Sequence, residues 1–384
     1  MRDVAIIGVG RTPVGEHWDK SLRMLASEAI LAAQDNAGLE NVDALYVGNA
    51  YGASYSSQQQ LGSLLADYVG LSGVEAFTVE AGDASGAAAL RAGYLAVASG
   101  DVETALVVGV EKSTDTVGSA RITARNVSLD ADFESAQGAT LTALAAMLMR
   151  RYLHEYNLKL DVFEGFSINA HANGGRNEFA MYRNSIKPGR FVTAPMVAEP
   201  VNLFDMAPDA DGAAAVILTS AERAEDMVPH PIRIAGSAVA TDTLALHDRA
   251  DMLFLRAAHL SAHKAYARAG IRSSDVHLFE LHDSFTVISA LTLEATGFAE
   301  RGEGWKMAQA GLIGLNGKLP ISTFGGLKAR GNPAGATGVY QAVEATLQLR
   351  GAAGANQVDG ARIALIQNLG GLGSTAIAHV LQVQ

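Results

Sequence analysis

The sequence predicts an α/β fold made of two similar halves, with a long insertion in the first half. Short apolar runs alternate with longer helical runs rich in Ala and Leu, a pattern typical of parallel sheets with helices packed on them. A strand–turn–helix pattern also recurs in the first and second parts of the chain. Residues 113–200 break the alternation, because they carry scattered basic residues and polar turns.

The predicted strands are short, apolar and bounded by turn residues, as buried strands usually are. They cover residues 4–10, 44–49, 77–80, 105–110, 213–219, 276–281 and 363–369. The predicted helices lie between them, at residues 20–37, 58–69, 85–99, 141–156, 252–269, 285–296 and 337–350. This order is the one that parallel strands joined by helical crossovers require.

The repeated pattern relates residues 77–90 to residues 278–291, both of which run from a strand through a turn into a helix. In each segment a Glu is followed three residues later by an Asp: Glu80 with Asp83, and Glu280 with Asp283. We interpret the match as a duplication, with one copy at the third strand of each half.

The duplication divides the chain into halves at residues 1–235 and 236–384, and the insertion at about 113–200 belongs to the first half. A long irregular segment in a compact domain is usually functional. We therefore expect the insertion to act as a lid or to bind a ligand.

Composition excludes several classes of function. The chain has a formal net charge of −11 and no run rich in Lys and Arg, so nucleic-acid binding is not expected. It has no cysteine, which excludes disulfides, thiolate nucleophiles and Cys-ligated metals, and we expect no metal site among its histidines. No apolar run approaches a membrane span and no signal peptide is evident, so we expect a cytoplasmic protein with no membrane partner.

Four segments carry candidate functional residues. Asp83 stands where an apolar run ends and a helix of small residues begins. His282 follows a strand at a turn. At that position it either faces a ligand crevice or is a structural histidine, and its position alone favours neither. The Gly-rich segment at 325–338 either cradles an anion or turns the chain, and the one at 367–374 indicates a tight turn.

Together these segments resemble the thiolase superfamily, most closely its archaeal and sterol-carrier-type, acetyl-CoA acetyltransferase-like branch. The resemblance spans the chain in family order through ASGAAALRAGYLAVASG (84–100), DGAAAVILTS (211–220), HDSF (282–285), GGLKARGNPAGATG (325–338) and NLGG (368–371). It implies a thiolase fold, with two βαβαβαββ halves in a five-layer αβαβα arrangement and a loop domain near 113–200. It also implies a homodimer or homotetramer.

The sequence departs from this family at the catalytic positions. The family's nucleophilic cysteine falls on Asp83, its activating histidine on Asn332 and its second cysteine on Asn368, while His282 is retained. A thiolate is needed to take an acyl group from coenzyme A, and Asn332 cannot accept a proton. The covalent route of a thiolase therefore looks disabled.

The machinery that polarises a thioester is retained. The resemblance implies one oxyanion hole formed by His282 and Asn332, which we expect to face one pocket, and a second formed by the backbone N–H groups of Asp83 and Gly370. Such donors stabilise an acyl-CoA enolate, which retro-aldol cleavage or decarboxylation reaches without an acyl-enzyme. We therefore expect acyl-CoA substrates, with no tightly bound cofactor.

Three roles remain open for Asp83: a general base, an N-cap of the following helix, or the relic of a lost active site. An inactive scaffold is the alternative function, in a complex with a hydroxymethylglutaryl-CoA synthase-like enzyme and a zinc-ribbon/OB-fold acyl-CoA-binding protein. If coenzyme A binds directly, its phosphates need basic residues of the insertion, and the pool is Arg150, Arg151, Arg176, Arg183, Lys187 and Arg190.

Overall fold

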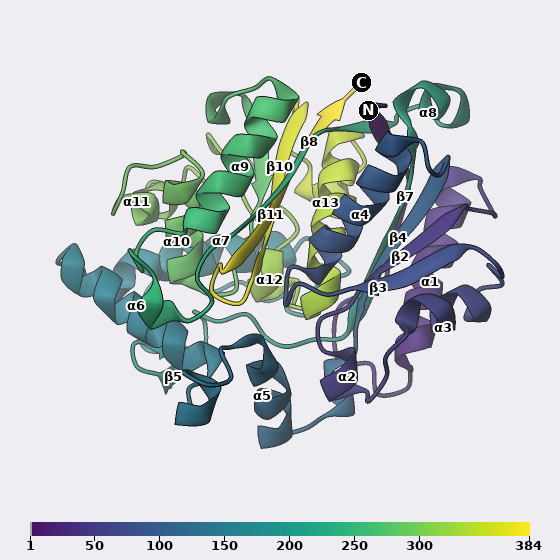
Figure 1. Cartoon of the computed structure of the whole chain (residues 1–384). Coiled ribbons are helices and arrows are strands. Elements are labelled where there is room, and N and C mark those ends of the chain that lie inside the picture. The colour runs from purple at the N-terminus through teal and green to yellow at the C-terminus, as the bar shows by residue number, and fades with distance from the viewer. Residues whose placement is uncertain (1) are drawn as a thin grey trace.

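The computed structural model describes residues 2–384 and shows one mixed sheet with helices on both sides (Figure 1). The first half contributes β1 (Val4–Arg11), β2 (Ala44–Gly48), β3 (Glu75–Val79), β4 (Thr104–Glu111) and β7 (Gly212–Ser220). The second half contributes β8 (Ile232–Thr241), β9 (Leu278–Glu280), β10 (Ile363–Gly370) and β11 (Thr375–Val383). The order of the nine strands is β3-β2-β4-β7-β1-β8-β11-β10-β9.

Each predicted helical run contains a helix of the structure, and further helices that were not predicted lie outside these runs. In the first half the helices are α1 (Leu22–Ala37), α2 (Gly52–Tyr55), α3 (Leu61–Tyr68), α4 (Ser85–Ser99) and α8 (Ala221–Met227). In the second half they are α9 (Arg256–Ala269), α10 (Thr286–Ala295), α11 (Gly304–Gln309), α12 (Gly326–Ala329) and α13 (Thr337–Leu349). The insertion holds α5 (Ser119–Arg125), α6 (Leu141–Glu155), α7 (Glu164–Gly174) and a hairpin of β5 (Met196–Ala198) with β6 (Val201–Asn202).

The two halves share one strand order. Reading outward from the centre of the sheet, the first half runs β1-β7-β4-β2-β3 and the second runs β8-β11-β10-β9. In each half the second strand of this order, β7 or β11, is antiparallel to both of its neighbours. A single parallel bridge between Phe279 and Ile321 stands where the second half would have its fifth strand.

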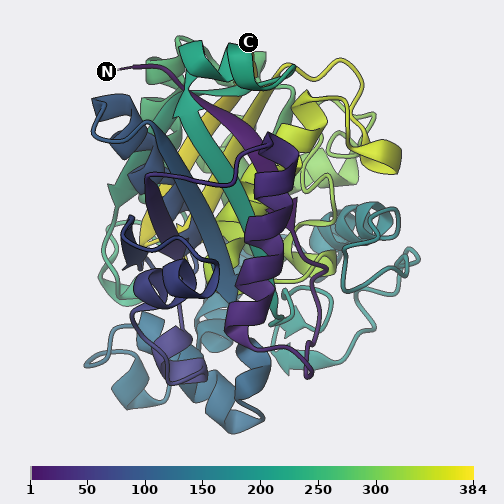
Figure 2. The same cartoon turned by 90° about the vertical axis from the view of Figure 1, so that its right-hand side faces the viewer.

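The helices and the two halves of the sheet form the expected five layers (Figures 1 and 2). Helices α1 and α3 cover the outside of the first half, α9 and α10 cover the outside of the second, and α4 and α13 lie between the two. Strand β4 shows why, since its apolar side chains alternate: Leu106 and Val108 face α1, whereas Ala105 and Val107 face the central helices. The halves also join edge to edge, through two residue pairs between β1 and β8.

One detail of the predicted duplication is wrong. Strand β9 occupies the place of β2 in its half, not the place of β3. The Glu–Asp pair after β3 is therefore not equivalent to the pair after β9. The helix that corresponds to α4 by position is α13, which begins after Asn332, and the expected boundary at residue 235 falls inside β8.

The insertion between β4 and β7 lies across one end of the sheet, away from the two chain ends (Figures 1 and 2). Strands β1 to β4 run parallel to one another, and Asp83 follows the carboxyl end of β3. His282 follows the carboxyl end of β9, and Asn368 and Gly370 lie near the carboxyl end of β10. The carboxyl ends of parallel strands are where α/β folds usually bind ligands.

The contact between α4 and α13 requires glycine. A Cβ on Gly338 would lie 2.3 Å from the backbone nitrogen of Ala87 and 2.6 Å from Asn368 Oδ1. We expect Gly338→Ala to lower the free energy of unfolding by about 1–3 kcal/mol, the usual cost of overpacking. Urea denaturation measures it, with Gly15→Ala as control, because a Cβ on Gly15 meets nothing within 4 Å. Equal losses in the two variants would contradict the packing argument.

Candidate active site

His282 is a buried, neutral imidazole with one N–H that the protein leaves unused. The residue is 0% exposed, and Asn368 Nδ2 lies 2.8 Å from its Nδ1. An amide nitrogen only donates, so Nδ1 accepts and the ring proton sits on Nε2. Nε2 has no hydrogen-bond partner among residues 2–384. Burial, followed by the charges of Arg125, Arg330 and Lys328, lowers the pKa of His282 to about 3, so the ring is neutral at physiological pH.

Asp83 is fully buried and forms an ion pair. Tyr51 donates its hydroxyl to Asp83 Oδ1 at 3.1 Å, and Arg125 Nη2 donates to Oδ2 at 2.9 Å. The N-cap position of α4 belongs to Ala84, and no side chain caps the helix there. The N-cap role considered for Asp83 is therefore wrong, because its carboxylate bonds to other side chains.

A cavity of about 270 Å³, the inner cavity, adjoins this ion pair. Asn332, Arg125 and Asp209 provide its polar groups nearest the ion pair. Thr337 donates to Asn332 Oδ1 at 2.8 Å, which leaves the amide N–H groups of Asn332 for a ligand. The other residues of the wall are Ile122, Asn126, Thr140, Leu141, Thr142, Val197, Ala198, Met206, Ala207, Ser284 and Phe285.

The structure brings the five sequence-predicted site residues into one cluster: Asp83, His282, Asn332, Asn368 and Gly370. Asn368 contacts His282 directly. Gly370 lies against the turn that carries Asp83, since a Cβ on Gly82 would be 3.6 Å from the Gly370 Cα. Arg125 links this turn to Asn332, because it pairs with Asp83 and lines the inner cavity.

Asn332 is the only one of these five residues on the wall of the inner cavity as far as residues 2–384 define it. The His282 side chain is not part of that wall, although Ser284 and Phe285, two and three residues further along the chain, are. Asp83 is not part of the wall either, but its ion-pair partner Arg125 is. That the side chains of His282 and Asn332 face one pocket therefore remains a prediction.

Three charged residues of the site were not predicted. Arg125 lies between two carboxylates, Asp83 and Asp209. Glu111, at the end of β4, accepts the backbone N–H of Gly335 at 3.0 Å and so ties β4 to the loop that carries Asn332. Burial raises the pKa of Glu111 to about 7. The basic stretch that contains Arg125 was visible in the sequence, but no spacing rule connects it with a distant strand end.

The basic residues expected to bind coenzyme A do not line the inner cavity; they are Arg150, Arg151, Arg176, Arg183, Lys187 and Arg190. Arg150 donates to the backbone oxygen of Glu199, and Arg151 pairs with Glu155 on the surface of α6. The cation on the inner wall, Arg125, is already shared by two carboxylates. Within residues 2–384, the inner cavity thus lacks an uncommitted cation for a phosphate.

Lys187 and Arg190 line a larger cavity of about 840 Å³, the insertion cavity. Met206 belongs to the walls of both cavities. The remaining residues of the insertion cavity are His171, Tyr182, Asn184, Ser185, Ile186, Leu203, Phe204, Pro208 and Lys328.

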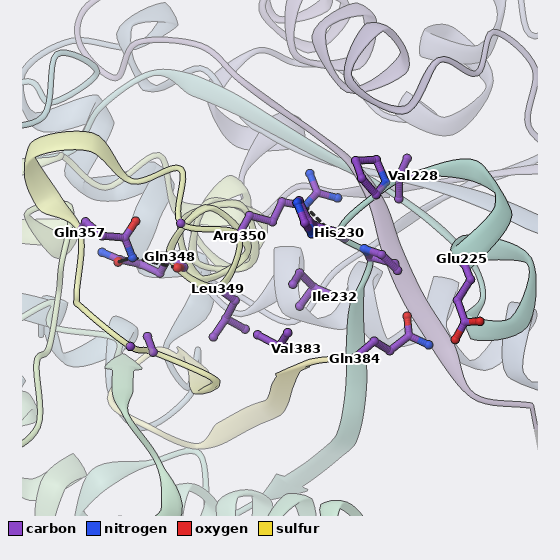
Figure 3. A pocket seen from close by; sticks show the side chains of 15 residues that line it. Glu225, Val228, His230, Ile232, Gln348, Leu349, Arg350, Gln357, Val383 and Gln384 are labelled. Carbon is purple, nitrogen blue, oxygen red and sulfur yellow. Dashed lines mark hydrogen bonds between the residues drawn. The ribbon is translucent and has the colours of Figure 1, made fainter.

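A third cavity, of about 530 Å³, lies beside the carboxyl end of α13 and the start of β8 (Figure 3). Arg350 in its wall donates to the backbone oxygens of His230 at 2.9 Å and Ile7 at 3.0 Å. This guanidinium therefore holds α13 to β1 and to the segment before β8. None of the sequence-predicted site residues lines this cavity.

No helix within residues 2–384 combines the length and the apolar character needed to cross a bilayer. The same residues contain no group of three or more His, Asp and Glu side chains that could hold a metal ion.

Two buried neutral histidines make the protein less stable in acid. Burial lowers the pKa of both His282 and His379 to about 3 from 6.5. Between these values the unfolded chain binds protons that the folded chain does not, so stability is full above about pH 6.5 and falls as the pH drops toward about 3. Relative to about pH 7.5, His379→Gln should recover about 1.4 kcal/mol at about pH 5.5. Urea denaturation at both pH values measures this, and parallel losses in variant and parent would contradict it.

The chain belongs to the thiolase family. A family model described as thiolase, N-terminal domain, matches residues 4–196, and one described as thiolase C-terminal domain-like matches residues 238–383. The resemblance drawn from the sequence motifs is thereby confirmed.

Proteins similar to this chain include an acetyltransferase, a thiolase subunit and an aldolase. The acetyl-CoA acetyltransferase of Methanothermobacter thermautotrophicus is 41% identical over 382 residues, covering 99% of each chain. The benzoylsuccinyl-CoA thiolase subunit BbsB of Thauera aromatica is 30% identical, covering 96% of this chain and 95% of the other. A solved structure described as the Ltp2-ChsH2(DUF35) aldolase has a TM-score of 0.86 at 26% identity, covering 99% of this chain and 98% of the other.

Proposed function

We propose that the protein acts on acyl-CoA thioesters through an enolate, and makes or breaks a carbon–carbon bond without an acyl-enzyme. The observation that carries this proposal is the unpartnered Nε2–H of the neutral His282 ring. Such an N–H can donate to a thioester oxygen as negative charge develops there. The printed names of the relatives, which include two CoA-thioester enzymes and an aldolase, support the substrate class and the bond chemistry.

An acyl-enzyme does not fit this site. The chain has no cysteine, and Asp83 occupies the family's nucleophile position. A carboxylate that attacked a thioester would give a mixed anhydride, which is uphill and prone to hydrolysis. Asp83 is also held by Tyr51 and Arg125, so we assign it to positioning Arg125 on the wall of the inner cavity.

Asp209 is the carboxylate placed to move a proton, because it lines the inner cavity beside Asn332. In a retro-aldol step on a β-hydroxyacyl thioester, Asp209 takes the hydroxyl proton and the bond between the α and β carbons breaks. The β carbon leaves as a carbonyl compound, and the electron pair of the broken bond forms the enolate. His282 Nε2–H and the Asn332 amide hold the enolate oxygen, and Asp209 returns its proton to the α carbon.

Asn368 and the backbone support this arrangement. The Asn368 amide fixes the tautomer of His282, because it donates to Nδ1. The backbone N–H groups of Asp83 and Gly370 are the second donor pair in this proposal, since their two turns are in contact.

A partner protein would complete the coenzyme A site. The inner cavity offers no uncommitted cation within residues 2–384, so phosphate binding needs basic residues from elsewhere. The solved aldolase is described as a complex with a DUF35 protein, which supports a partner protein for this chain. We propose that this partner is the zinc-ribbon/OB-fold protein that the sequence resemblance implies. A non-catalytic scaffold in such a complex is the second candidate function, favoured by the three replaced catalytic side chains.

A second copy of the chain would cover strand β3. This strand forms one edge of the sheet, and its Phe77 is 46% exposed. Exposed edge strands readily pair with another chain. Light scattering on the purified protein tests for a homodimer or homotetramer, and a monomer would refute this part of the proposal.

Hydrogen exchange on acetyl-CoA tests the enolate proposal without knowledge of the natural acyl group. In D₂O, the protein should catalyse deuterium incorporation at the α carbon, measured by mass spectrometry of the thioester. Intact-protein mass should show no acetyl adduct after the same incubation. Absence of exchange with the protein, alone and with an added DUF35 partner, would leave the scaffold as the function, and an adduct on Asp83 would overturn the mechanism.

A further inference from the structure

The insertion cavity is chemically unlike the inner cavity. Its wall includes the apolar side chains of Leu203, Phe204 and Met206 and three cations, Lys187, Arg190 and Lys328. No carboxylate belongs to this wall within residues 2–384. With about 840 Å³ of space, a positive charge balance and apolar surface, the cavity suits a ligand that is both anionic and apolar.

Lys328 is the buried cation on the wall of the insertion cavity. It lies on α12 and is 2% exposed, and its Nζ donates to the backbone oxygen of Asp205. An ammonium has three N–H donors, and the other two find no acceptor among residues 2–384. Burying a cation with unfilled donors is costly, which favours an anionic ligand atom beside it.

The carboxylates nearest to Lys328 are committed elsewhere. Asp205 Oδ2 accepts the backbone N–H of Asn202 at 2.9 Å, and Asp283 Oδ1 accepts that of Leu327 at 2.7 Å. Neither carboxylate lies within 4 Å of the Lys328 ammonium. Burial lowers the pKa of Lys328 to about 8 against the opposing charges of Asp283 and Asp205, so the ammonium is still largely protonated at neutral pH.

The two cavities lie on opposite sides of one extended segment. Met206 lines both cavities, Ala207 and Asp209 line the inner cavity, and Pro208 lines the insertion cavity. Alternation of this kind is what an extended backbone produces. A ligand in the insertion cavity would therefore touch the segment that carries Asp209 without entering the thioester site.

We propose that the insertion cavity is a second binding site, for an amphipathic carboxylate whose apolar body packs on Leu203, Phe204 and Met206 and whose carboxylate meets Lys328. The exposed Lys187 and Arg190 attract the anion toward the cavity. This site is separate from the inner cavity, and the inference does not depend on the enolate chemistry proposed above.

Calorimetric titration of the full chain with decanoate tests the proposal, alongside decanol and inorganic phosphate. Decanoate should bind with a saturable one-to-one isotherm, decanol more weakly and phosphate not at all. Lys328→Met should weaken decanoate binding by about tenfold or more, because a charge-assisted hydrogen bond is lost, and should leave decanol binding unchanged.

A second variant keeps the test decisive if Lys328→Met does not fold. Leu203 is 55% exposed and lines the cavity, so Leu203→Glu adds a carboxylate there without disturbing the core. It should weaken decanoate binding at least as much, whereas Arg150→Gln, outside the cavity, should leave it unchanged. No decanoate binding by the parent protein, equal affinity for decanol, phosphate binding as tight as decanoate, or undiminished binding by Leu203→Glu would each overturn the proposal.

Discussion

His282→Ala is expected to slow deuterium exchange at the α carbon of acetyl-CoA by about 10²–10³-fold, the usual effect of losing one oxyanion donor. The reason is that Nε2–H of the neutral ring is a buried donor without a hydrogen-bond partner among residues 2–384. Exchange rates are compared at equal concentrations of folded protein, because the variant also leaves the Asn368 amide without its acceptor.

His379→Gln is the matched control for this prediction. His379 is another fully buried, neutral imidazole, but its Nε2 is 3.2 Å from the Ala87 carbonyl, so its ring N–H already has an acceptor. Its replacement should leave the exchange rate unchanged. An exchange rate of His282→Ala close to that of the parent protein would rule out His282 as the donor.

Asp83→Ala is expected to lower the free energy of unfolding by about 3 kcal/mol. The change removes a buried carboxylate from Arg125 and leaves the buried hydroxyl of Tyr51 without an acceptor. The loss lies at the lower end for a broken buried ion pair, because Arg125 keeps Asp209. Urea denaturation followed by circular dichroism measures it.

Two further variants define the cause of that loss. Asp83→Asn retains an acceptor for Tyr51 and removes only the charge, so it should be less destabilising than Asp83→Ala. Arg151→Ala breaks the exposed pair with Glu155 and should cost well under about 1 kcal/mol. If Asp83→Ala were no less stable than Arg151→Ala, the ion pair with Arg125 would not be holding the site together.

The predicted fold was correct wherever a strand is a continuous apolar run. Strands β8 and β11 were missed because polar residues interrupt them: Arg233 and Ser237 in β8, and His379 in β11. Both strands lie between two neighbours in the sheet, so even polar residues within them, such as Ser237 and His379, are fully buried. A pattern read along one strand does not contain that information.

The residues of the site also separate into those that a local motif predicts and those that depend on contacts between distant segments. The positions of Asp83, His282 and Asn332 followed from local motifs, which a sequence displays directly. Arg125 did not, because the ion pair joins a strand end to a helix of the insertion and depends on how the two meet in space. The mistaken match between the Glu–Asp pairs has the opposite cause: local spacing agreed, and the strand order showed that the two places differ.

The layer that holds α4 and α13 has a consequence for the independence of the two halves. One apolar cluster there contains Leu90 and Val107 from the first half together with Val339 and Ile366 from the second. If the two halves were made as separate polypeptides, each would expose its part of this apolar surface. We therefore expect the halves to fold only when they are mixed and cover each other. An ancestor of half the present length would have faced the same exposure, and a second copy of itself is the partner that would have covered it.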